Sequence, residues 1–124
     1  MPSGKKSILV VDDEVDTLGL LRTILEYEGF EIWEASNGKE ALKEVQKMPN
    51  LILLDIKMPG GLSGLDVCHH LKKDEKYKHI PIIIFSAKVL SHDIELGLQA
   101  GAVEYITKPF SSKELIRLVN LHIL

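Results

Sequence analysis

The sequence predicts an α/β fold in which five parallel strands alternate with five helices, a (βα)5 arrangement. Short apolar runs recur along the chain, and each is followed by a segment with apolar residues at helical spacing. Three of the runs are almost entirely aliphatic, which is typical of strands buried on both faces of a parallel sheet. The predicted strands run from Ser7 to Val11, Glu31 to Ala35, Leu51 to Leu54, Ile82 to Ser86 and Val103 to Ile106.

The first helix is predicted by a face of leucines. Leu18, Leu21 and Leu25 are spaced so that they share one side of a helix. We expect this helix to run from Asp16 to Glu28, because Gly29 can adopt the left-handed backbone that ends many helices. The strand that follows is more polar than the others and is predicted to lie at an edge of the sheet.

The remaining helices are predicted from residues that can cap a helix N-terminus. A capping side chain is followed three residues later by an acid in three pairs, Asn37 with Glu40, Ser63 with Asp66, and Ser111 with Glu114. Ser91 is expected to cap the fourth helix, which ends at Gly101. The predicted helices are Gly38 to Lys47, one that begins after Ser63, one that begins after Ser91, and Ser112 to Leu124.

The composition is that of one globular domain spanning residues 1–124. Hydrophobic residues make up 45% of the chain and charged residues 27%. A net charge of −3 argues against nucleic acid or an anionic membrane as a partner. The first apolar run ends at Asp12, too early for a signal peptide or a membrane span. The single cysteine, Cys68, is expected to be buried and reduced, so we expect a cytoplasmic protein.

Three aspartates follow two of the predicted strands. Asp12 and Asp13 close the first strand, and Asp55 closes the third. If these strands are neighbours, carboxylates about 5 Å apart would repel by roughly 3 kcal/mol per pair at an effective dielectric constant near 20. A divalent cation such as Mg²⁺, which prefers oxygen ligands, would relieve this repulsion.

Two further polar residues lie at or just after the ends of predicted strands. Ser86 ends the fourth strand, and Lys108 lies just after the fifth. Ligands of open α/β sheets bind beyond the carboxyl ends of the strands, where the strand order reverses. We therefore expect one pocket, framed by three acids and one lysine, that can hold a phosphoryl group.

These residues resemble the receiver domain of two-component response regulators, including its chemotaxis regulators. The resemblance covers nearly the whole chain. It implies a flavodoxin-like, doubly wound three-layer sandwich with strand order 2-1-3-4-5. It depends on the motifs Asp12-Asp13, Leu53-Leu54-Asp55, Met58-Pro59, Ser86-Ala87, Gly101-Ala102 and Lys108-Pro109-Phe110.

The resemblance implies that Asp55 is the phosphoacceptor and that the chain is a signalling module, not a turnover enzyme. Asp55 would take a phosphoryl group from the phosphohistidine of a sensor histidine kinase or phosphotransfer protein. Mg²⁺, or Mn²⁺ in its place, would be bound by Asp13, Asp55 and the main-chain carbonyl of Lys57, with Asp12 acting through water. Lys108 would supply a second positive contact, after a Lys-Pro bond that is often cis in the family.

The resemblance also implies a conformational switch. Phosphorylation would draw the hydroxyl of Ser86 inward, and the vacated space would admit Tyr105 from an exposed position. The surface made by the fourth helix, the fifth strand and the fifth helix would then change shape and control an effector or output domain. The sequence does not identify this partner. Lys57 and Lys88 occupy positions that in the family affect the access of hydrolytic water, so the resemblance implies an effect on phosphoryl lifetime.

One loop departs from the common family pattern. The segment Met58 to Gly64 is one residue longer than usual and lacks the acid that normally precedes its last glycine. The departure concerns the geometry of this loop and none of the expected ligands.

Three other functions remain open. A phosphohydrolase of the haloacid dehalogenase type also uses an aspartate nucleophile and Mg²⁺, but it needs a second aspartate where this chain has Lys57. A flavodoxin-like cofactor binder would need a first loop that cradles phosphate, and the acids of this loop would repel one. A receiver-shaped interaction domain that never accepts phosphate is the third, and the complete set of site residues argues against it.

Overall fold

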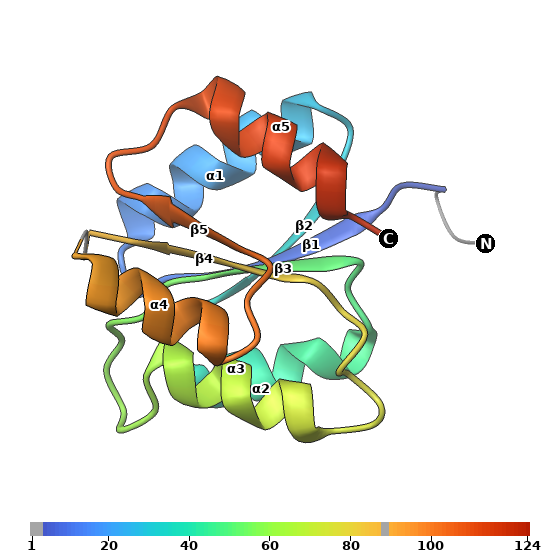
Figure 1. The fold of residues 1–124 in the computed structure, drawn as a ribbon. Coiled ribbons are helices and arrows are strands. Elements are labelled where there is room, and N and C mark those ends of the chain that lie inside the picture. The colour runs from blue at the N-terminus through green and yellow to red at the C-terminus, as the bar shows by residue number, and fades with distance from the viewer. Residues whose placement is uncertain (1–3, 88–89) are drawn as a thin grey trace.

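The computed structural model describes residues 4–87 and 90–124, which contain a five-stranded parallel sheet between two layers of helices (Figure 1). The strand order, β2-β1-β3-β4-β5, confirms the predicted doubly wound, flavodoxin-like sandwich. The strands are β1 (Ser7–Val11), β2 (Glu31–Ala35), β3 (Leu51–Leu54), β4 (Ile82–Ser86) and β5 (Glu104–Thr107). One face is covered by α1 (Val15–Tyr27) and α5 (Ser112–His122), the other by α2 (Gly38–Glu44), α3 (Gly64–Lys73) and α4 (Ser91–Gln99).

The apolar runs of the central strands are explained by burial on both sides of the sheet. In β1, Ile8 and Val10 belong to the core beneath α1 and α5, whereas Leu9 and Val11 belong to the core on the opposite face. All four side chains are fully buried. Strand β2 instead has two buried residues, Ile32 and Ala35, among more exposed ones and lies at the edge of the sheet, as predicted.

Three helices begin with the predicted side-chain caps. At α3, the Ser63 hydroxyl accepts a hydrogen bond from the Asp66 amide (3.2 Å), and the Asp66 carboxylate accepts one from the Ser63 amide (2.9 Å). This reciprocal pair is a capping box. Similar single caps join Asn37 to Glu40 at α2 and Ser111 to Glu114 at α5. Among the described residues, no helix has both the length and the apolar character needed to cross a bilayer.

Several element ends differ from the predicted ones. The fourth helix begins after Leu90, whose extended backbone occupies the N-cap position, so Ser91 is the first helical residue and makes no cap. The second helix is α-helical to Glu44 and continues as the 3-10 turn Val45–Lys47, which ends at the left-handed Met48 (φ 59°). The predicted ends of α1, α4, α5 and β5 are shifted by one or two residues.

Two single-residue predictions are confirmed. Gly29 follows α1 with a left-handed backbone (φ 94°), as expected for a residue that ends a helix. The Cys68 side chain is fully buried, and its thiol lies 3.3 Å from the Ala100 carbonyl oxygen. Burial raises the pKa of Cys68 to about 11, so the thiol stays neutral.

Candidate functional site

The carboxyl ends of four strands bring the predicted site residues to one edge of the sheet. Strands β1 and β3 are paired in register to their last residues, so Asp12 and Asp55, which follow them, lie next to each other. Ser86 ends β4 and Lys108 follows β5. The chain runs from β1 to β2 on one side and to β3 on the other, so the site lies where the strand order reverses.

The Lys108 ammonium is the cation at the centre of this site. Its Nζ lies 2.9 Å from an Asp12 oxygen, 3.3 Å from Asp55 Oδ2 and 4.0 Å from Glu14. It also lies 4.8 Å from the centre of the Phe85 ring. Burial alone would lower the pKa of Lys108, but the hydrogen bond to Asp12 and the charges of Asp55 and Asp12 outweigh it, so the pKa is raised. Lys108 is therefore charged. Its peptide bond to Pro109 is cis.

Asp12 is a buried carboxylate with both oxygens occupied. Its side chain has no exposed surface. Oδ2 accepts a hydrogen bond from Lys108 at 2.9 Å, and Oδ1 accepts one from the Glu14 amide at 3.0 Å. A buried charge with these two partners is held in one orientation, so Asp12 fixes the position of the lysine ammonium.

Asp55 is also buried, with only 6% of its surface exposed. Its Oδ1 accepts a hydrogen bond from the Ile56 amide at 2.9 Å, which leaves Oδ2 directed toward Lys108. Burial raises the pKa of Asp55 to about 6; the charge of Lys108 opposes this effect and that of Asp12 adds to it. Without a metal, a proton therefore competes for this carboxylate just below neutral pH.

The three aspartates form a cluster of oxygen donors. Asp12, Asp13 and Asp55 each place one carboxylate oxygen within 4.8 Å of the others, and Asp13 is the exposed member. Carboxylate oxygens are the ligands that Mg²⁺ and Mn²⁺ prefer. The donor set therefore fits a divalent cation, and Lys57, whose carbonyl is predicted to be a further ligand, lines the same pocket.

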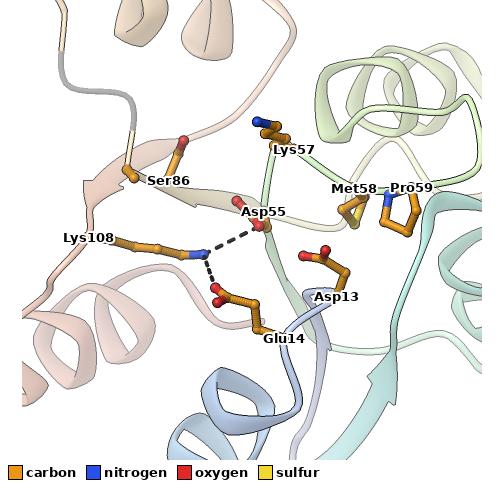
Figure 2. Close-up of a pocket in the computed structure, with 9 residues that line it drawn as sticks. Asp13, Glu14, Asp55, Lys57, Met58, Pro59, Ser86 and Lys108 are labelled. Atoms are coloured by element: carbon orange, nitrogen blue, oxygen red, sulfur yellow. Dashed lines mark ion pairs between the residues drawn. The ribbon is translucent and has the colours of Figure 1, made fainter.

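The site opens into a pocket with a volume of about 500 Å³. Figure 2 shows Asp55 in the middle of it, between Lys108 on one side and Met58 and Pro59 on the other. The mouth of the pocket thus combines charged groups with an apolar wall. Its lining residues are Asp13, Glu14, Asp55, Lys57, Met58, Pro59, Ser86, Ala87 and Lys108.

Ser86 and Tyr105, the predicted switch residues, are already in contact. Ser86 is 3% exposed, and its hydroxyl lies close enough to that of Tyr105 to influence its pKa. Tyr105 is only partly exposed, so the expectation that its side chain starts from an exposed position is not met. Burial raises the pKa of Tyr105; the interaction with Ser86 opposes this rise, and nearby carboxylates add to it.

Two contacts of Lys108 were missed by the sequence reasoning. Phe85 lies beneath the ammonium, but an aromatic residue within an aliphatic strand gives no sign of this role. Glu14 approaches Lys108 because it follows the two aspartates directly, and its place in an acidic run was the available signal. Lys88, the second residue expected to affect hydrolytic water, lies outside the described residues.

Solved structures similar to this one include receiver domains and response regulators. The chemotaxis protein CheY4 of Vibrio cholerae superposes with a TM-score of 0.89 at 25% identity, over 97% of this chain and 100% of that one. A response regulator described as putative from Chloroflexus aurantiacus has a TM-score of 0.86 at 32% identity, over 94% of this chain and 97% of that one.

Curated relatives lead to the same family. The DNA-binding response regulator MtrA of Mycobacterium tuberculosis is 40% identical over 121 residues, which are 97% of this chain and 51% of that protein. The chain thus spans about half the length of the curated relatives it matches. The model of the response regulator receiver domain matches residues 8–120. The chain therefore belongs to the receiver domain family of two-component response regulators.

Proposed function

We propose that residues 1–124 form a single receiver domain in which Asp55 accepts a phosphoryl group. The observation that carries this proposal is the position of Asp55, a buried carboxylate with one oxygen 3.3 Å from the Lys108 ammonium, inside a cluster of three aspartates. The donor would be the phosphohistidine of a sensor histidine kinase or of a phosphotransfer protein. The domain would promote its own phosphorylation and also its own dephosphorylation, which would be slow. It would not act as a turnover enzyme.

In the proposed transfer, Asp55 Oδ2 attacks phosphorus and forms an acyl phosphate. The bond between phosphorus and the histidine nitrogen breaks, and the imidazole keeps the electron pair and takes up a proton. Negative charge on the transferring phosphoryl oxygens would be balanced by Lys108, which Asp12 already holds at 2.9 Å. Ile56 would help to keep Asp55 in place, because its amide binds the other oxygen.

Receiver domains use Mg²⁺ at a cluster of acidic residues, which in this chain consists of Asp12, Asp13 and Asp55. We infer that Asp13, Asp55 and the Lys57 carbonyl would hold the ion directly and Asp12 through water. When bound, the ion would offset charge on the phosphoryl oxygens. Mn²⁺ shares this preference for oxygen ligands and would be an alternative.

Signalling would follow from the contact between Ser86 and Tyr105. An acyl phosphate at Asp55 adds charge and acceptor oxygens next to Ser86, which lines the same pocket. If the Ser86 hydroxyl turns toward these oxygens, its interaction with the Tyr105 hydroxyl is lost, and the ring can change position. The surface of α4, β5 and α5 would then change for an effector.

The proposed partners are a kinase or phosphotransfer protein and an effector or output domain. The relative MtrA is named as a DNA-binding regulator. We propose that the segment described here does not itself contact nucleic acid or a membrane, because its net charge is −3. The proposed location is the cytoplasm, which agrees with the single, buried thiol.

Incubation with acetyl phosphate and Mg²⁺, followed by intact mass measurement, tests this function. The wild type is expected to gain one phosphoryl group, and Asp55→Asn is expected to gain none. Asp74→Asn, at the far end of α3, is the matched control and should behave as the wild type. An adduct on Asp55→Asn would contradict the proposal, and repeated turnover of phosphate esters would favour the phosphohydrolase.

A further inference from the structure

Helix α4 packs against the sheet through a glycine. Among the residues of this helix, which the structure describes in full, Gly97 is the buried one. The leucines on either side of it, Leu96 and Leu98, remain 38% and 46% exposed. The helix therefore approaches β5 along its own backbone at this point, as its place over β4 and β5 in Figure 1 indicates.

The ring of Tyr105 occupies the space that a side chain at position 97 would need. A Cβ atom built on Gly97 would lie 2.9 Å from Cδ2 and 3.1 Å from Cε2 of Tyr105. It would also lie 3.2 Å from Cδ1 of Ile84. Carbon atoms pack favourably only at about 3.5 Å or more, so the ring could not stay where it is.

Backbone conformation does not explain this glycine. Gly97 is in the interior of an α-helix and does not have a positive φ angle, unlike Gly101, which follows the helix with φ 112°. Alanine has the higher helix propensity at such a position. The glycine is thus explained by the contact it permits with Tyr105.

We propose that Gly97 is a positioning residue for Tyr105: its missing side chain lets the ring lie inward, where the hydroxyl reaches Ser86. A methyl group at position 97 would displace the ring, because a tyrosine side chain can rotate about its own bonds more readily than the helix backbone can move. The inference deepens the proposed function, since it rests on Ser86 and Tyr105 being the switch.

Gly19 offers a matched control within the same chain. It lies in the interior of α1, and a Cβ atom built on it would meet no atom within 4 Å. Gly19→Ala and Gly97→Ala therefore bring the same gain in helix propensity. Only the second introduces a contact with the Tyr105 ring.

The test uses protein labelled with fluorotyrosine and ¹⁹F NMR, before and after incubation with acetyl phosphate and Mg²⁺. The chain has three tyrosines, and Tyr105→Phe assigns the resonance of Tyr105. In unphosphorylated Gly97→Ala, this resonance is expected to move toward that of free fluorotyrosine and to show a larger shift between H₂O and D₂O. Gly19→Ala should change neither the position of the resonance nor its shift between H₂O and D₂O. An unchanged Tyr105 resonance in Gly97→Ala would overturn the inference.

A double-mutant cycle keeps the test decisive if Gly97→Ala is unstable. In a Tyr105→Ala background the clash with the ring is absent and only the 3.2 Å approach to Ile84 Cδ1 remains, so Gly97→Ala is expected to lower the melting temperature by less than it does in the wild-type background. An equal loss of stability in both backgrounds would overturn the inference. Intact mass of the same samples reports phosphorylation of Asp55 separately, so failure of the proposed function would be seen independently.

Discussion

The Lys108 ammonium lies 2.9 Å from Asp12 and 3.3 Å from Asp55, so the lysine is bound more closely by the fully buried carboxylate than by the proposed phosphoacceptor. Asp12 thus holds the cation, and one Asp55 oxygen is left directed into the pocket. This arrangement predicts that the residues around Asp55 contribute unequally to the rate of its phosphorylation.

Asp12→Asn is expected to slow phosphorylation by acetyl phosphate by about 10- to 100-fold, the usual cost of losing a residue that orients a ligand or cation. Glu14→Gln should change the rate by less than about threefold, because Glu14 is 67% exposed and 4.0 Å from Lys108. The rates can be measured by intact mass spectrometry over time. Equal effects of the two variants would contradict the role given to Asp12.

Lys108→Met is expected to destabilise the metal-free protein by about 3 kcal/mol, since it leaves the buried Asp12 carboxylate without its cation. Urea unfolding in EDTA measures this loss. Mg²⁺ should restore stability to this variant in part, because the ion supplies the missing positive charge. Lys113→Met, on the exposed surface of α5, is the control and should be close to neutral; a Lys108→Met variant as stable as this control would disprove the pairing.

Asp55→Asn is expected to stabilise the metal-free protein near neutral pH. The pKa of Asp55 is raised by burial to about 6 from an ordinary value of 3.8, so the folded state holds the proton more strongly than the unfolded state does. Raising the pH through this interval therefore removes stability from the wild type, and the full penalty, about 3 kcal/mol, is present above pH 6.

Unfolding experiments in EDTA at several pH values test this sign. The advantage of Asp55→Asn should be largest near pH 7.5 and should fall by about half at pH 5, where the wild-type carboxyl is mostly protonated in the folded state. If the stability gained by Asp55→Asn instead grew as the pH fell, the folded state would favour the ionised form of Asp55, and the predicted sign would be wrong.

Gly64→Ala is expected to lower both stability and the rate of Asp55 phosphorylation. A Cβ atom on Gly64 would overlap the carbonyl oxygen of Asp55, so either the start of α3 or the end of β3 must move. The loss should be about 2 kcal/mol or more, because main-chain atoms cannot yield as a side chain can. Thermal unfolding and phosphorylation rates should both be close to wild type for Gly19→Ala, and full activity in Gly64→Ala would rule out the overlap.

The parts of the fold that the sequence predicts are those set by local pattern. The aliphatic runs of β1 and β3 fix where Asp12 and Asp55 emerge, and a capping box marks the start of α3 at Ser63. The predicted start of α4 differs from the observed one by one residue. The N-cap is Leu90, which makes no side-chain cap, so no capping residue marks this position in the sequence.

The parts that escape prediction depend on contacts between distant segments. Tyr105 lies inward because Gly97 of another element leaves room for it. Phe85 lies beneath Lys108 because β4 and β5 are neighbouring strands, and neither residue type reveals the contact. A sequence pattern shows which residue follows a strand, whereas the space left beside a side chain depends on packing.

Trapping the phosphorylated residue tests the central claim most directly. Borohydride reduces an acyl phosphate to an alcohol, so peptide mass spectrometry after reduction locates the modified side chain. After incubation with acetyl phosphate and Mg²⁺, the account predicts reduction at Asp55 alone, and no reduction when EDTA replaces Mg²⁺. Modification at another carboxylate or at a histidine, or labelling that does not require the metal, would contradict it.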